Sequence, residues 1–167
     1  ANGYNNTEAH GGADTNVSST GNAVLYLIDV SDGSLIRKFD TGVGTAADPT
    51  GAGRPNGLAS ASPVDLNGDR IADYIYAGDL FGNVWKIDVR DASSSNWDFA
   101  YKSGANPQPL FVAKDSGGNR QPITSRLEVG LHPTQSGQVV LFGTGKYLEN
   151  GDNAATGQQT QTFYAVW

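Results

Sequence analysis

The feature that most constrains the fold of this chain is an internal repeat. The segment NVWKIDV at residues 83–89 echoes AVLYLIDV at residues 23–30, with Trp85 in the place of a tyrosine. TFYAVW at residues 162–167 is a third, weaker copy that carries Tyr164 in the aromatic position. Self-similarity of this kind indicates a structural unit that recurs along the chain and stacks on its neighbours.

A second alignment extends the repeat to the strands that precede the aromatic segment. At a constant offset of 65 residues, Ile75 falls on Val140 and Gly78 falls on Gly143. Each unit is therefore expected to be a small antiparallel sheet of strand, loop, strand, tight turn and aromatic strand. Such repeated sheets are typical of β-propeller blades, and a closed propeller needs about 4–8 of them. We expect an all-β chain that forms a segment of a modified propeller, with antiparallel blades and long inter-strand loops.

The pattern divides the chain into a polar arm and a propeller segment. Residues 1–20 lack hydrophobic periodicity and are expected to form an arm or linker, whereas residues 21–167 carry the repeat. The expected partial blades are residues 21–42, 56–90 and 109–167. Because the chain does not begin with Met and stops inside an expected strand, we expect a fragment of a larger, exported protein.

Short apolar runs and 22 glycines favour many strands joined by turns over helices. The first two expected strands form a hairpin around Ser31-Asp32-Gly33, and a tight turn is expected at DSGGN, residues 115–119. The expected strands are residues 23–30, 34–41, 58–64, 71–78, 82–89, 98–102, 109–114, 122–129, 137–143 and 162–167.

Composition excludes several classes of function. The net charge of −6 argues against binding to nucleic acid or to anionic membranes, which need basic surfaces. The absence of cysteine excludes disulfides, thiolate metal sites and cysteine nucleophiles within the sequence. No apolar stretch approaches the ~20 residues that a membrane-spanning helix needs, so direct membrane insertion is not expected.

The sequence DLNGDRIAD, residues 65–73, concentrates three carboxylates and an amide within nine residues. Carboxylates this close repel one another unless a cation lies between them. Calcium prefers six to eight oxygen ligands at about 2.3–2.6 Å and often takes them from alternate residues of a tight loop. The predicted calcium ligands are the side chains of Asp65, Asn67, Asp69 and Asp73, and the backbone carbonyl of Ile71.

The alternative interpretation is a solvated turn, because Asp and Asn are common turn residues. The repeat offers a comparison: GLHPTQSGQ, residues 130–138, has the same length and is expected to join the same two strands without a carboxylate. Turn formation alone would then not require the acids, which favours calcium. The loop is not an EF-hand, because Arg70 replaces the glycine at position 6 and Tyr76 the glutamate at position 12.

No catalytic constellation is present in the sequence, so an enzyme is not predicted. His10 and His132 are the only imidazoles, and neither lies in a Ser/His/Asp or HExxH context. Asp29 and Asp88 end strands and are expected to accept hydrogen bonds from turn amides. The segment NGDN at residues 150–153 is a weaker candidate for a second ion because its spacing is poor. Core or inter-blade packing is expected for Tyr26, Tyr76, Trp85, Phe142 and Tyr164.

The segment NGLASASPVDLNGDRIADYIYAGDLFGNVWKIDV, residues 56–89, resembles the C-terminal domain of the type IV pilus-associated proteins of the PilY/PilC family. These proteins are pilus-tip adhesins and biogenesis factors. The resemblance continues through PLFVAKDSGGNRQPITSRLEVGLHP at 109–133, VVLFGTGKYLE at 139–149 and TQTFYAVW at 160–167, and it includes residues 21–42 upstream. It implies a modified propeller in a large secreted protein of pilus-bearing bacteria.

The resemblance also implies a calcium loop of the form Asp-x-Asx-x-Asx-x-x-x-Asp, which falls on residues 65–73. In the family, calcium at this loop is linked to control of pilus extension against retraction, and hence to twitching motility and attachment. The implied partners are pilus components (minor pilins) and surface or host targets. The implied location is the cell surface, at the pilus tip or associated with the outer membrane.

Two alternatives stay open at the level of sequence. The blade endings LYLIDVSDG and VWKIDV also resemble the repeats of quinoprotein dehydrogenases, which are propeller enzymes. The vicinal cysteine pair often found at such quinone sites does not exist in this chain. The second alternative is an integrin-like propeller repeat with calcium-binding hairpin loops.

Overall fold

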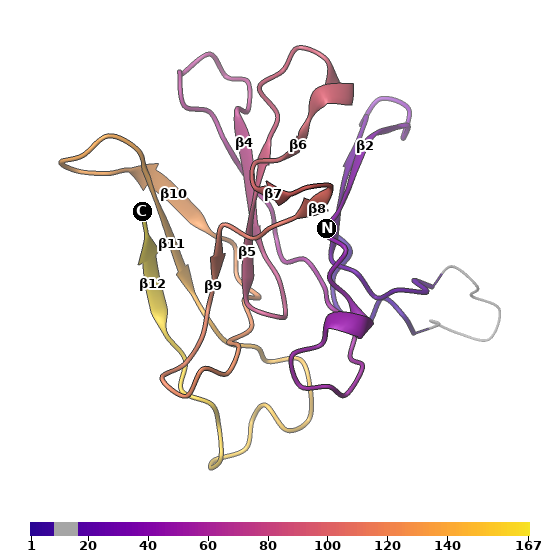
Figure 1. The fold of residues 1–167 in the computed structure, drawn as a ribbon, viewed down its shortest axis with the longest axis vertical. Helices are drawn as coiled ribbons and strands as arrows, with labels where there is room; N and C mark the ends of the chain where they lie inside the picture. Colours follow the sequence, from indigo (N-terminus) through magenta and orange to yellow (C-terminus); the bar gives the residue numbers. More distant parts are fainter. Residues whose placement is uncertain (9–16) are drawn as a thin grey trace.

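The computed structural model describes residues 1–8 and 17–167, which form antiparallel sheets arranged side by side (Figure 1). The first sheet is the expected hairpin: β1 (Val24–Ile28) pairs with β2 (Leu35–Asp40). Its turn relies on Gly33, whose φ of +76° lies in the left-handed region that only glycine adopts without strain.

The second sheet is the most complete unit. It runs in the order β3 (Ser62–Val64), β4 (Tyr74–Gly78), β5 (Asn83–Asp88) and β6 (Asp98–Phe99), all antiparallel. Two strands pair with the edge of β5 that faces away from β4. β6 pairs with the C-terminal end of β5, and β9 (Phe111–Val112) pairs with its N-terminal end. The strand expected at 58–64 is shorter than predicted, and Leu58 forms only an isolated bridge to Asp79.

The third sheet has the order β10 (Glu128–Leu131), β11 (Gln138–Gly143) and β12 (Phe163–Val166). Elsewhere the chain forms a small hairpin and two short 3-10 helices, none of which the pattern predicts. These are β7 (Lys102–Ser103), β8 (Asn106–Pro107), η1 (Thr45–Ala47) and η2 (Ser94–Asn96).

The register of the strands confirms the repeat in three dimensions. Ala77 pairs with Trp85 in the second sheet, and Phe142 pairs with Tyr164 in the third. Ala77 and Phe142 are 65 residues apart, whereas Trp85 and Tyr164 are 79 residues apart, because the third sheet has extra residues between β11 and β12. The fold is therefore the all-β propeller segment that the sequence predicts.

Two cores lie between the sheets, and the second sheet contributes to both of them. Trp85 and Ile87 of β5 join the first core, whereas Val84 faces the second. Residues of a strand alternate between its two faces, so a sheet buried on both faces reads as a continuous apolar run. This explains why β4 and β5 are buried along most of their length.

The predicted packing of the aromatic residues is confirmed at three positions. Trp85, Tyr76 and Phe142 are almost completely buried. Tyr164 is half-buried, with its ring stacked 5.2 Å from that of Phe142. Tyr26 differs: it is 41% exposed, because it lies on the face of the first sheet that points away from the second sheet.

A fully buried carboxylate ties the first two sheets together. Asp79, in the turn after β4, accepts five hydrogen bonds and has no cationic partner among the residues described. The donors are the backbone amides of Phe81 and Asn83, the side-chain amides of Asn56 and Asn83, and the indole of Trp85. Asn56 also donates to the carbonyl of Val43, so the carboxylate is linked to the end of the first sheet.

The third sheet contains a related group of buried hydrogen bonds. Gln121, which is the counterpart of Asn56 at the 65-residue offset, is also fully buried. Its side chain donates to the hydroxyl of Thr162 at 2.9 Å and accepts from the hydroxyl of Tyr164 at 2.8 Å. The repeat therefore includes a buried amide that bonds, directly or through a carboxylate, to the aromatic strand of its own blade.

The first residues of the chain contact the propeller segment. The side chain of Asn2 donates to the carbonyl of Asn22 and accepts from the amide of Val24, and Asn6 donates to the carbonyl of Asn56. No helix in the described part of the chain is long and apolar enough to cross a membrane.

Candidate metal centre

The acidic loop connects β3 to β4 at one end of the second sheet (Figure 1). It is closed by a backbone hydrogen bond of 2.8 Å from the amide of Asp73 to the carbonyl of Val64. The carbonyl of Asp73 also accepts a hydrogen bond of 3.0 Å from the amide of Val89, the residue that follows β5. The loop is therefore anchored on the central strands of the sheet.

The predicted side chains turn inward onto the backbone of the loop. One oxygen of Asp65 accepts from the amides of Asn67 (3.1 Å) and Gly68 (2.7 Å), and the other accepts from Arg70 (2.7 Å). Asn67 accepts from the amide of Asp69 at 2.8 Å. Asp65 thus organises the first half of the loop.

The other two carboxylates hold the second half. Asp69 accepts the amide of Ile71 at 2.8 Å, and Asp73 reaches back to the amide of Leu66 at 2.7 Å. The chain can turn this tightly because Gly68 and Arg70 have φ values of +81° and +73°. A left-handed backbone at a residue other than glycine is uncommon.

The loop carries an excess of negative charge. It contains three carboxylates and one guanidinium, and none of the three takes part in an ion pair within the described residues. Hydrogen bonds from backbone amides, that of Arg70 first, lower the pKa of Asp65 below its ordinary value. Asp65 is therefore ionised at neutral pH.

The donor set fits calcium in its chemistry. All five predicted ligands offer hard oxygen atoms, and an oxygen that accepts one amide retains a second lone pair. Among residues 1–8 and 17–167, no three His, Cys, Asp or Glu side chains gather into a group that could hold a metal ion. A calcium shell at this loop would need Asn67, the carbonyl of Ile71 and water in addition to the carboxylates.

The comparison loop of the third sheet differs from the prediction. Val140, the counterpart of Ile75, pairs with Val129, whereas Ile75 pairs with Pro63, so the register is shifted by one residue. Part of the predicted nine-residue loop is taken into the strands, which leaves a shorter turn over residues 132–137. The prediction that the two loops have the same length is therefore wrong, although both loops join equivalent strands and the shorter one contains no carboxylate.

The shorter turn shows what a connection of this kind needs. The ring nitrogen Nδ1 of His132 accepts the amides of Thr134 (3.3 Å) and Gln135 (2.9 Å). One oxygen of Asp65 has the same role, because it also accepts the amides of the residues two and three positions later in the chain. One imidazole nitrogen and a backbone hydrogen bond from His132 to Gly137 hold this turn, whereas the loop at 65–73 carries three carboxylates.

The weaker candidate at residues 150–153 already has a cation of its own. The ammonium of Lys146 bonds to both Glu149 and Asp152, and it lowers the pKa of Asp152 to about 2. The second oxygen of Asp152 accepts the amides of Leu148 and Glu149. Lys146 therefore takes the place that an ion would occupy.

The residues considered for catalysis have structural roles where they are described. Asp29 accepts the amide of Ser31 at 2.8 Å and Asp88 accepts that of Arg90 at 3.1 Å, as predicted. His132 packs against the ring of Trp167, with ring centres 4.8 Å apart. His10 lies outside the described residues.

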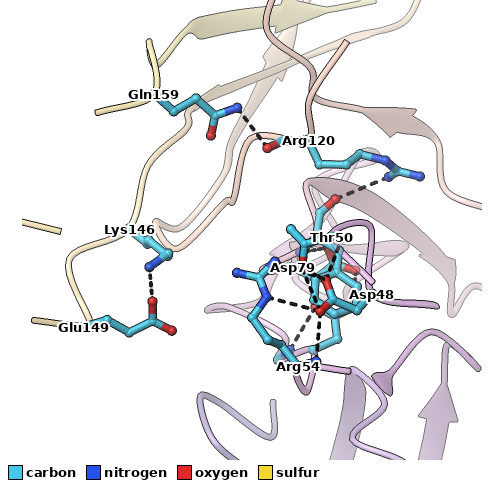
Figure 2. Close-up of polar contacts among 11 residues, drawn as sticks. Asp48, Thr50, Arg54, Asp79, Arg120, Lys146, Glu149 and Gln159 are labelled. Atoms are coloured by element: carbon cyan, nitrogen blue, oxygen red, sulfur yellow. Dashed lines mark hydrogen bonds and ion pairs between the residues drawn. The ribbon is translucent and has the colours of Figure 1, made fainter. Parts of the chain in front are cut away.

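A cleft of about 840 Å³ lies among the loops at the other end of the sheets, and sequence reasoning missed it. Figure 2 shows polar groups around it: Lys146 with Glu149, Arg54 with Asp48, and Gln159 with the carbonyl of Arg120. The lining comes from segments far apart in the sequence, so the polar residues form no motif. Their only signal was the concentration of Gly, Asn and Gln in long loops.

Comparison with known proteins identifies the family. The family model described as the PilY1 beta-propeller domain matches residues 1–167. A type IV pilus biogenesis factor PilY1 homolog from Xylella fastidiosa is 39% identical over 154 residues, and PilY1 from Pseudomonas aeruginosa PAO1 is 39% identical over 158 residues. These alignments cover 90% and 87% of this chain, but only 10% and 13% of the relatives.

A solved structure gives the same result. The crystal structure of the Pseudomonas aeruginosa PilY1 C-terminal domain matches with a TM-score of 0.76 and 37% identity. The match covers 90% of this chain and 32% of that chain. The predicted family resemblance is confirmed, and the chain belongs to the PilY1 β-propeller domain family.

Proposed function

We propose that this chain is the calcium-binding propeller segment of a non-enzymatic protein that supports type IV pilus assembly and attachment. Through its calcium loop, the protein controls pilus extension against retraction, and hence twitching motility. The observation that carries the proposal is the loop at 65–73, where three carboxylates without an ion partner among the described residues lie on one short connection. The names of the relatives, type IV pilus biogenesis factors, support the pilus context.

The residues of the loop have different roles in the proposed calcium site. Asp65 shapes the loop through three backbone amides, while Asp69 and Asp73 each have one oxygen that accepts no hydrogen bond from the described residues. Those oxygens, the oxygen of Asp65 that accepts only the amide of Arg70, Asn67 and the carbonyl of Ile71 would hold calcium. When bound, calcium neutralises the carboxylates and stabilises the loop, as metal binding commonly couples to local folding.

The proposed partners are pilus components, including minor pilins, together with surface or host targets. The proposed location is the cell surface or the pilus tip. Nucleic acid is not proposed as a partner, because a net charge of −6 provides no general attraction to it. The names of the relatives also support a non-enzymatic role over a quinoprotein-like enzyme.

Isothermal titration with calcium tests the proposal. We expect binding at millimolar or lower calcium, the range used by extracellular modules. Asp69→Asn should weaken it by about tenfold or more, equivalent to about 1.4 kcal/mol. The matched control is Asp32→Asn, because Asp32 also accepts one backbone amide two residues ahead, at the same distance of 2.8 Å.

Two results would contradict the calcium site: no heat from the unmutated chain, or equal losses in Asp69→Asn and Asp32→Asn. The pilus role is tested separately, by placing Asp69→Asn in the complete protein of a pilus-bearing bacterium. We expect less twitching, measured as the width of the motility zone, with unchanged abundance of the protein. A normal zone would contradict the proposed control of the pilus.

A further inference from the structure

The cleft at the far end of the sheets is separate from the calcium loop. The loop at 65–73 precedes β4, whereas Leu80 and Phe81, which line the cleft, belong to the turn that follows β4. The two sites are therefore at opposite ends of the same strand. The volume of about 840 Å³ lies within the roughly 300–1,000 Å³ that is usual for small-molecule sites.

Ion pairs cancel part of the charge in the cleft. Lys146 bonds to Glu149 and Asp152, and the hydroxyl of Tyr4 donates to the other oxygen of Glu149. Arg54 is paired with Asp48 at 3.1 Å. Because the lining also carries one basic side chain for each acidic one, the cleft offers no strong net field. Of the basic side chains in the lining, Lys114 and Arg120 take no part in an ion pair within the described residues, and two such groups are too few for a multiply charged ligand such as a nucleotide.

Fixed carboxamides supply hydrogen-bond acceptors. The amide nitrogen of Gln159 donates to Asp115 (2.9 Å) and to the carbonyl of Arg120 (3.1 Å), and that of Gln161 donates to the carbonyl of Gln159. Gln158 is held in the same way by the carbonyls of Gly151 and Ala154. The side-chain oxygens of these three glutamines accept no hydrogen bond from the described residues, so they are available at little cost in side-chain entropy.

Donors and an apolar wall complete the lining. Arg120 uses one nitrogen, Nη1, for Asn83 (2.7 Å) and the carbonyl of Phe81, which leaves its other nitrogens without a partner in the described structure. Pro55, Pro122 and Leu80 also line the cleft. A ligand that matches this site must be close to neutral, must donate and accept several hydrogen bonds, and must present an apolar face.

We propose that this cleft binds a neutral saccharide, and that it does so independently of calcium. Sugar hydroxyls both donate and accept, so they suit a lining of paired carboxylates, amide oxygens and a guanidinium. The C–H face of a pyranose ring suits the prolines and Leu80. The size of the cleft allows a short oligosaccharide.

The test applies the labelled full chain to an array of neutral and acidic oligosaccharides. Hits are then measured by saturation-transfer NMR with the free sugar. We expect binding to neutral members of the array and a loss of about tenfold or more in affinity for Gln161→Ala. Glu149→Gln, which preserves the shape of the side chain, should also weaken binding. The matched control is Gln135→Ala, an exposed glutamine in the turn of the third sheet, which should bind like the unmutated chain.

Three outcomes would overturn this proposal: binding to no saccharide, binding only to acidic saccharides, or equal affinities for Gln161→Ala and the unmutated chain. Asp69→Asn and calcium removal separate this site from the calcium loop, since neither should change saccharide binding. Loss of saccharide binding on calcium removal would contradict the independence of the two sites.

Discussion

Gly78 and Gly143 occupy equivalent positions of the repeat but have different surroundings. A methyl group at Gly78 would lie 2.3 Å from Cγ2 and 2.7 Å from Cβ of Ile123, which is fully buried. At Gly143 no atom lies within 4 Å of the corresponding position. The glycine of the second sheet is therefore required by close packing against the segment that leads to the third sheet, whereas its counterpart is not.

This difference predicts the effect of alanine at the two sites. Gly78→Ala should lower the free energy of unfolding by about 1–3 kcal/mol, the usual cost of overpacking a core. Gly143→Ala should be near neutral, because alanine fits the space available. Urea unfolding of both variants measures the difference, and equal stability losses would mean that Ile123 moves aside freely.

Asp79 gives a second prediction at this scale. Its carboxylate accepts five hydrogen bonds, so replacing one oxygen with an NH₂ group in Asp79→Asn sets donor against donor in a buried site. We expect a loss of at least about 2 kcal/mol, because a buried polar group that lacks its partner costs roughly 1–3 kcal/mol. Chemical denaturation measures this loss. Asp29→Asn, at an exposed turn, is the control and should be nearly neutral.

At the scale of elements, the segment that follows β11 is held by a charged cluster with a defined pH dependence. The pKa of Asp152 is lowered to about 2 by Lys146, so the carboxylate binds protons less readily in the folded protein than when unfolded. Its contribution to stability is present above its ordinary pKa of 3.8 and is lost as the pH falls through about 2.

The prediction is a local transition in acid. The amides of Leu148 and Glu149 donate to Asp152, so their NMR chemical shifts should titrate with a midpoint near pH 2. In Lys146→Met the midpoint should move up toward the ordinary value of 3.8, because the ammonium is gone. An unchanged midpoint in that variant would show that the backbone amides alone hold the carboxylate.

The elements were predictable to the extent that their pattern is local. The apolar runs and the glycine turn predicted the β1–β2 hairpin, and the repeat predicted the counterpart relation of β5 and β12. The repeat did not predict the register of β10 against β11, which differs by one residue from that of β3 against β4. The register of a strand pair depends on the packing of the whole sheet as well as on the local pattern. The cleft was missed because side chains from distant loops meet there only after folding.

The acidic loop shows the same division. Its sequence identified the residues that carry the candidate ligand oxygens, and the structure adds that the carboxylates bond to amides of their own loop. That arrangement could not be read from spacing, because it depends on the left-handed backbone at Gly68 and Arg70. The ion itself stays a prediction.

At the scale of the whole molecule, the sheets are stabilised by stacking, so equivalent residues differ in importance with their place in the stack. Ile87 in the second sheet is 1% exposed and packs in the core shared with the first sheet. Ile28, its counterpart in the first sheet, is 56% exposed, because that face has no sheet against it among the described residues. The same contrast separates Trp85 from Tyr26.

The contrast predicts that one substitution has two outcomes. Ile87→Ala should cost about 2–5 kcal/mol, since it leaves a cavity between two sheets. Ile28→Ala should change the free energy of unfolding by about 0.5 kcal/mol or less, as is usual at exposed sites. Urea denaturation of the two variants measures both values. A large loss for Ile28→Ala would mean that its face is covered in solution, by another part of the molecule or by a second copy, and sedimentation velocity would distinguish these.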